Sequence, residues 1–83
     1  MKKIVLCLGV FITLSFGATK EQILSYEKMA NQGNIEAQKN LGYIYLEKEN
    51  YEKAFYWYKK ASDQGDFGAE LIIKKMYANG FIK

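Results

Sequence analysis

Gln32-Gly33-Asn34 recurs, 32 residues further along the chain, as Gln64-Gly65-Asp66. In the same register Ala37 returns as Ala69. A period of this length is typical of stacked supersecondary units, none of which can bury its apolar face alone. The spacing therefore predicts a repeat architecture that presents a surface, and it does not assemble an obvious reaction centre.

The amino terminus has the layout of a secretory signal peptide. Met1-Lys2-Lys3 is positively charged, residues 4–16 are almost wholly apolar, and small residues precede Ala18. We expect cleavage after Gly17, which leaves residues 18–83 as one domain in the periplasm of a bacterium or secreted from it. The alternative is an uncleaved anchor, but the apolar run is shorter than the roughly 20 residues that span a bilayer. Cys7 lies inside this run and leaves with it.

The composition of residues 18–83 excludes several classes of function. This stretch has no histidine, cysteine or arginine, which argues against ordinary metal centres, haem, iron–sulfur clusters and nucleophilic Ser/His or Cys/His pairs. We therefore expect no metal and no cofactor. Ten lysines and nine acids give it a net charge near +1, without the concentrated basic face of a nucleic-acid binder. A single core in so short a chain is expected to be marginal, so that association into a homo-oligomer is possible.

Apolar residues at helical spacing, separated by glycine or asparagine, predict an all-α fold. Thr19 and Gln22 form a capping box at the start of the first helix. The expected helices cover residues 20–31, 35–48, 51–63 and 67–79. The residues expected to face the core are Ile23, Tyr26, Ala30, Ala37, Leu41, Ile44, Tyr45, Tyr51, Ala54, Phe55, Tyr58, Ala61, Ala69, Ile72, Ile73, Met76 and Tyr77.

Small residues indicate how the second and third helices pair. Gly42 is expected to face Ala54 and Ala61, where reduced bulk lets two antiparallel helices approach closely. The short connection at residues 48–50 favours antiparallel neighbours. The prediction is a helical hairpin with the first helix before it and the fourth after it, a short α-solenoid.

These residues resemble a known family. Ala37-x-x-x-Leu41-Gly42-x-x-Tyr45, followed by Lys53-Ala54-x-x-Trp57-Tyr58-x-Lys60-Ala61-x-x-Gln64-Gly65, is similar to the Sel-one-like repeat, a relative of the tetratricopeptide repeat. The usual glycine-rich insertion before the second helix of the unit is replaced by Glu47-Lys48-Glu49-Asn50. The family's Leu-Gly pair becomes Ile73-Lys74 in the last helix. Lys74 suits the polar outer face of a terminal unit, whereas the alternative is a remnant of a longer array.

The resemblance implies a protein-interaction module that binds a peptide or protein partner on its concave face. In such repeats the first helix of each hairpin lines that face. The partner-binding residues that follow are Glu36, Lys39, Tyr43, Leu46, Glu47, Leu71 and Lys75. Tyr43 and Leu46 are expected to be exposed, and ordinary surface scatter is the alternative. For the aromatic cluster Phe55-Tyr56-Trp57-Tyr58, packing of Trp57 between repeats is favoured over a stacking platform for a ligand.

One alternative function belongs to a different class. Ser25-x-x-Lys28 fits the nucleophile motif of serine β-lactamases and penicillin-binding proteins. Cysteine-rich Sel-like proteins of Helicobacter are associated with such activity, so the resemblance gives the match some force. The supporting Ser-Asp-Asn and Lys-Thr-Gly motifs are absent from the sequence, as are that family's paired cysteines. The sequence therefore favours an interaction module without catalytic residues, with Ser25 as the nucleophile in the alternative.

Overall fold

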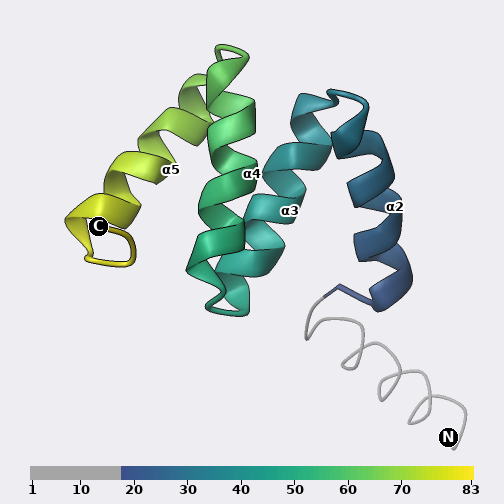
Figure 1. Ribbon diagram of the computed structural model, residues 1–83, viewed down its shortest axis with the longest axis horizontal. Coiled ribbons are helices and arrows are strands. Elements are labelled where there is room, and N and C mark those ends of the chain that lie inside the picture. Colours follow the sequence, from purple (N-terminus) through teal and green to yellow (C-terminus); the bar gives the residue numbers. More distant parts are fainter. Residues whose placement is uncertain (1–17) are drawn as a thin grey trace, which may run out of the picture.

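The computed structural model describes residues 18–83, and the expected signal peptide, residues 1–17, lies outside the described part. Four α-helices follow one another: α2 (Lys20–Asn31), α3 (Ile35–Glu47), α4 (Tyr51–Asp63) and α5 (Phe67–Ala78). Successive helices run in opposite directions (Figure 1). This confirms the all-α prediction, with α3 and α5 each ending one residue earlier than expected.

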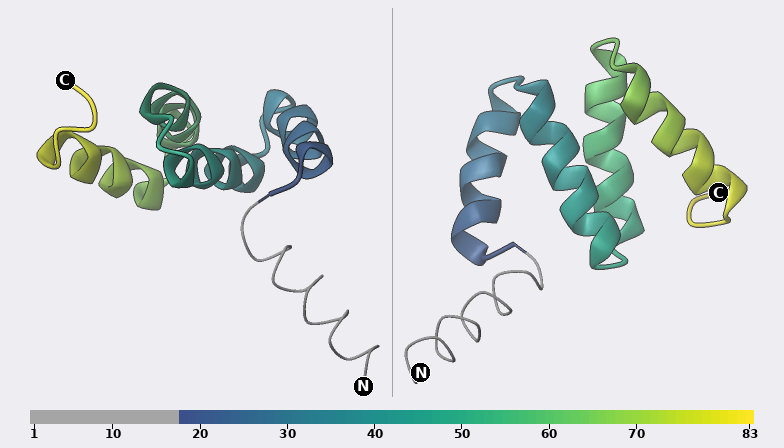
Figure 2. Two further views of the ribbon diagram at one scale, coloured as in Figure 1. Left: turned by 90° about the horizontal axis from the view of Figure 1, so that it is seen from below. Right: turned by 180° about the vertical axis from the view of Figure 1, so that it is seen from behind.

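The helices form two layers. Seen along their length, α3 and α5 lie in one layer and α2 and α4 in the other (Figure 2). Each helix packs against its neighbours in sequence, and the α3–α4 hairpin is the most extensive pairing. Within residues 18–83, no helix is long and apolar enough to cross a membrane.

The connections between helices share one compact design. After α2, the amide of Gly33 donates to the carbonyl of Ala30, and the amide of Asn34 donates to that of Met29. These two bonds make a Schellman motif, which satisfies carbonyl groups that the helix end would leave unpaired. Asn34 is also the N-cap of α3, where its side chain accepts the amide of Ala37 at 2.9 Å. One residue therefore completes one helix and starts the next, which explains the short connections.

The same motif ends the other helices, and glycine occupies the left-handed position in most of them. Gly33, Gly65 and Gly80 have φ angles of 93°, 94° and 77°. After α3 this position is taken by Glu49, with a φ of 59°. A side chain in that conformation costs roughly 1–2 kcal/mol, so the absence of glycine there weakens the turn without changing its geometry.

The core is a continuous cluster of aromatic, aliphatic and small side chains. Its buried members are Ala30, Ala37, Leu41, Tyr45, Ala54, Trp57, Tyr58, Ala61, Ala69 and Met76. Trp57 is buried, which confirms that it packs in the core and does not form a stacking platform for a ligand. Its neighbour Tyr56 is exposed, and the two rings meet edge to face with their centroids 4.9 Å apart. The prediction that Tyr77 faces the core is wrong. Tyr77 is 51% exposed because no described helix follows α5 to cover it as α4 covers Tyr45.

The side chain nearest to Gly42 is that of Tyr58 on α4. A Cβ atom at this position would lie 2.7 Å from two carbons of the Tyr58 ring and 2.9 Å from a third. The closest approach is therefore between the α3 backbone and the ring of Tyr58, which lies between Ala54 and Ala61 on the same face of α4. The ring lies flat in the space that the missing side chain leaves, and Tyr58 is 2% exposed as a result.

Candidate partner-binding face

The face of the α3–α5 layer is held together by a lysine of α3 and the aspartate that caps α5. The Nζ atom of Lys39 lies 3.4 Å from Oδ2 of Asp66 and 3.8 Å from Oε1 of Glu36. Oδ2 of Asp66 also accepts the amide of Ala69 at 2.9 Å. Lys39 is thus a fixed part of the contact between the two helices, while Glu36 is exposed beside it.

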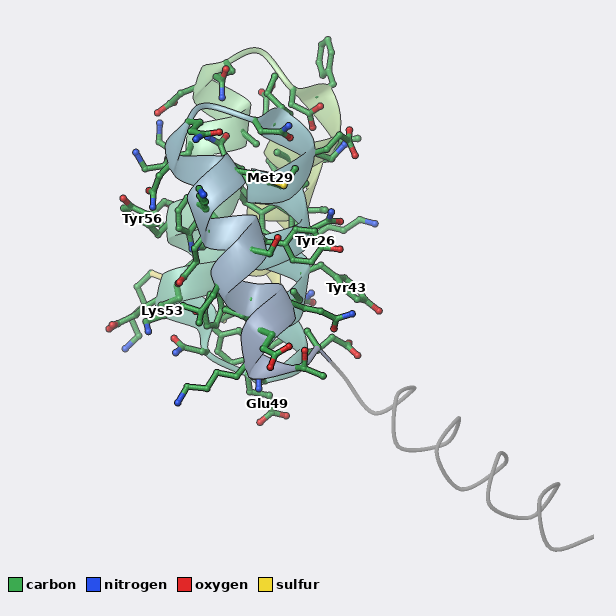
Figure 3. All side chains as sticks on the ribbon, turned by 90° about the vertical axis from the view of Figure 1, so that its right-hand side faces the viewer. Tyr26, Met29, Tyr43, Glu49, Lys53 and Tyr56 are labelled. Carbon is green, nitrogen blue, oxygen red and sulfur yellow. The ribbon has the colours of Figure 1, made fainter. Side chains whose placement is uncertain are left out.

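Tyr43 is the most exposed large hydrophobic side chain of α3, with 58% of its surface accessible. It lies on the opposite side of the molecule from Tyr56 and Lys53 of α4 (Figure 3). Burial, and to a lesser extent the charge of a nearby Tyr43 phenolate, together raise the pKa of Tyr58 to about 12. Tyr43 therefore stands near the buried ring of Tyr58, beside Gly42 in the α3–α4 hairpin.

The other expected partner-binding residues differ in their surroundings. Glu47, Leu71 and Lys75 are exposed. The prediction that Leu46 is exposed is wrong, because Leu46 is partly buried and packs against the core cluster. The structure joins Lys39 and Glu36 to the start of α5, and the role of the whole set in binding stays a prediction.

A polar cluster around the buried side chain of Gln38 joins α2, α3 and α4, and it does not appear among the residues that the sequence predicted. Gln38 of α3 is 3% exposed, and its Nε2 donates to the carbonyl of Ala30 at 3.0 Å. Nε2 of Gln64 donates to Oε1 of Gln38 and to the carbonyl of Gly33, both at 3.0 Å. Gln64 belongs to the repeated Gln-Gly-Asn/Asp motif. The recurrence of this glutamine in both units is the sequence feature that could have indicated a connecting role.

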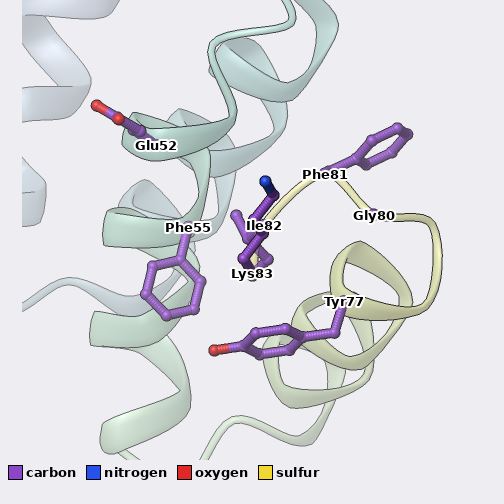
Figure 4. A pocket seen from close by; sticks show the side chains of 7 residues that line it. All are labelled: Glu52, Phe55, Tyr77, Gly80, Phe81, Ile82 and Lys83. Carbon is purple, nitrogen blue, oxygen red and sulfur yellow. The ribbon is translucent and has the colours of Figure 1, made fainter.

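A hollow of about 440 Å³ opens between α4, α5 and the carboxy-terminal segment (Figure 4). It arises because α4 and α5 diverge away from their connecting turn (Figure 1). Its lining residues are Glu52, Phe55, Tyr77, Gly80, Phe81, Ile82 and Lys83. The segment returns to α4 through Phe81, whose ring stacks on Tyr51 with centroids 4.3 Å apart. None of the expected partner-binding residues lines this hollow.

The residues of the alternative catalytic hypothesis lie on α2. Ser25 and Lys28 are three positions apart, and both are exposed to solvent. Neither belongs to the residues that line the hollow. Among residues 18–83 there is also no group of three or more acidic, histidine or cysteine side chains that could hold a metal ion.

Comparison with known proteins agrees with the repeat geometry. Residues 35–66, which cover α3, α4 and the turn that ends α4, match the family model of the Sel1 repeat. The chain is also 36% identical, over 52 residues, to a putative sel1-like repeat-containing protein, L21, of Acanthamoeba polyphaga mimivirus. That stretch is 63% of this chain but only 10% of the viral protein. No solved structure matches the chain. Residues 35–66 therefore form a Sel1 repeat, and α2 and α5 are helices in the repeat register on either side of it.

Proposed function

We propose that this Sel1 repeat module binds a segment of a partner protein on the face of the α3–α5 layer. Sel1 repeats generally serve as protein-interaction scaffolds, and the repeat here spans the hairpin that carries this face. The observation that supports the proposal most directly is the exposure of Tyr43. Its ring offers a large contact area with few rotatable bonds, on a hairpin whose own core is closed.

The surroundings of Tyr43 support recognition of an extended peptide segment with mixed character. Leu71 offers apolar surface on α5, while Glu36, Glu47 and Lys75 offer charges that are exposed. Lys39 is engaged with Asp66 and positions the two helices. Tyr43 and Leu71 would therefore anchor a partner, and the charges at the border would select its sequence.

We also propose that the module acts outside the cytoplasm, because the signal-peptide pattern of residues 1–17 directs export. The partner is then a protein of the bacterial envelope or of the surroundings of the cell.

Two tyrosines of similar exposure provide a matched test. Tyr43 on α3 is 58% exposed, and Tyr56 on α4, on the opposite side of the molecule, is 51% exposed. Purified wild-type protein and the variants Tyr43→Ala and Tyr56→Ala would each be used to capture proteins from envelope extract, with circular dichroism to confirm folding. We expect Tyr43→Ala to lose the specific partner, because it removes an interface anchor, and Tyr56→Ala to retain it. Equal retention by both variants would refute the assignment of this face.

A further inference from the structure

Helix α5 has apolar side chains on nearly all of its sides. Only one of these sides packs against the rest of the molecule. Ala69 and Met76 are buried against α4. At 3.6 residues per turn, Phe67, Leu71 and Ala78 lie on the opposite side of the helix. Phe67 is 78% exposed and Leu71 is 55% exposed. Helix α5 as a whole lies at the opposite side of the molecule from α2 (Figure 1). A helix with apolar side chains all round is normally buried.

The repeat register shows that this surface is more apolar than its counterpart in α3. Phe67, Leu71 and Ala78 correspond to Ile35, Lys39 and Leu46, all of which are partly buried. Position 39 of α3 is partly buried and carries a lysine. Its equivalent on α5, position 71, is exposed and carries a leucine. Phe67 and Leu71 are both apolar and exposed, so that this side of α5 has the character of a contact surface.

We propose that this side of α5 packs, antiparallel, against α5 of a second copy of the chain and forms a two-fold symmetric dimer. Such an interface must be complementary to itself. Glu70 lies in the first turn of α5, and Lys74 follows one turn later on the same flank, with Nζ 3.7 Å from Oε1 of Glu70 within one copy. In an antiparallel pair the same flanks meet. Glu70 of each copy then lies beside Lys74 of the other, and the helix dipoles also oppose each other.

The apolar side chains fit the same register. An axis near the middle of the helix places Phe67 of one copy against Ala78 of the other, so that a large side chain meets a small one. Leu71 comes close to the axis and meets its own equivalent. Because α5 has only 12 residues, the interface is small and the dimer is expected to be weak and dependent on protein concentration.

This dimer goes beyond the proposed function and needs no other partner. The two surfaces share Leu71, but Tyr43 lies on α3 and takes no part in the α5 pair. Mass measurements on the purified protein alone test the dimer, whereas capture of a partner through Tyr43 tests the proposed function. Either can fail without the other.

Leucines at the two ends of the molecule provide the first test. Leu71 on α5 is 55% exposed, and Leu24 on α2 is 58% exposed. Sedimentation equilibrium of the wild-type protein would be measured over a wide range of concentrations, beside Leu71→Asp and Leu24→Asp, after circular dichroism confirms folding. We expect the average mass of wild type and of Leu24→Asp to rise toward twice that of the monomer. Leu71→Asp should remain a monomer throughout, because it places a charge at the axis.

A charge exchange tests the antiparallel register. Glu70→Lys and Lys74→Glu should each weaken self-association, because each brings like charges together across the axis. An equimolar mixture of the two variants should associate at least as strongly as wild type, since every pair across the interface is then opposite in sign. A wild-type protein that stays monomeric, or association that survives Leu71→Asp, would overturn the proposal. A mixture that associates no better than its components would overturn the register.

Discussion

Replacing Gly42 with alanine places a single methyl group where the Tyr58 ring now lies. The new Cβ would be 2.7–2.9 Å from three ring carbons. Favourable contacts between carbon atoms fall near 3.5–4.0 Å, so the ring must retreat by roughly 0.8 Å or the two helices must separate. Tyr58 is 2% exposed and has no free space to enter.

Two opposing terms set the size of the effect. Overpacking a closed core typically costs about 1–3 kcal/mol. Alanine within a helix is favoured over glycine by about 1 kcal/mol, and this offsets part of the cost. Gly42→Ala is therefore expected to lower the free energy of unfolding by between nearly zero and about 2 kcal/mol. Gly42→Leu should cost more, since it keeps the clash and adds further atoms, and in a marginal domain it should prevent folding near physiological temperature.

Gly68 is a matched control within the same chain. It is also a helical glycine, but an added Cβ would meet only the flexible ends of Asp66, at 3.3 Å, and of Lys39, at 3.7 Å. Gly68→Ala should therefore be neutral or slightly stabilising. Comparison of the two alanine variants largely removes the propensity gain, and their melting temperatures should differ by about 4–24 °C at 4–8 °C per kcal/mol. Thermal unfolding followed by helical circular dichroism, at one protein concentration, measures this difference.

A double-mutant cycle separates the clash from other causes. In a Tyr58→Leu background the ring is gone, so the penalty of Gly42→Ala should disappear and leave only the propensity gain. If Gly42→Ala melts at or above the temperature of Gly68→Ala, the contact between Gly42 and Tyr58 does not limit packing. An unchanged penalty in the Tyr58→Leu background would also contradict it.

Further expectations concern other parts of the chain. Gln64→Ala should lower the free energy of unfolding by about 1–3 kcal/mol, because it leaves the buried Oε1 of Gln38 unpaired. Gln32 is the repeat equivalent of Gln64, and Gln32→Ala should be near neutral; urea unfolding measures both. Since the pKa of Tyr58 is raised from 10.0 to about 12, its contribution to folding stability is complete below pH 10 and is lost between pH 10 and 12; Tyr58→Phe should reduce that loss in unfolding curves at several pH values. Ser25→Ala should leave nitrocefin turnover at the background of the wild-type protein, and a turnover that this change abolishes would support the catalytic alternative. Intact-mass spectrometry of envelope fractions should find a mature chain that begins at Ala18 or within a residue or two of it, whereas Met1 retained in a cytoplasmic fraction would contradict export.

The helix boundaries could be predicted because the signals that set them are local. Asn34 and Asp66 cap the helices that follow them, and Gly33 and Gly65 take up the left-handed conformation that ends the preceding ones. Each signal depends on a few consecutive residues, so it can be read without knowing how the helices pack. The turn at Glu49 lacks the glycine, and there the boundary was predicted from Asn50, which caps the helix that follows.

The faces of the helices were harder to predict because they depend on what lies beside them. Each inner helix of the hairpin packs against two neighbours, which widens its buried side and brings Trp57 into the core. The same argument explains Leu46, which packs against the core cluster, and Tyr77, left exposed at the end. The ring that packs on Gly42 was not predicted because helical spacing shows only which residues share a face. It does not show which side chain crosses to the neighbouring helix.

The order in which the helices contact one another also determines how the molecule opens. Because α2 packs mainly on α3, and α5 mainly on α4, either outer helix can detach without breaking the central hairpin. Proteins open locally where buried contacts are fewest, so amide protons of α2 and α5 should exchange with solvent before those of α3 and α4. The buried amide of Gln38 opposes this at the α2 end, where it bonds the last turn of α2. At the α5 end the Lys39–Asp66 pair and the stacked rings of Tyr51 and Phe81 oppose it, so that the two ends of the module are held by contacts of different kinds.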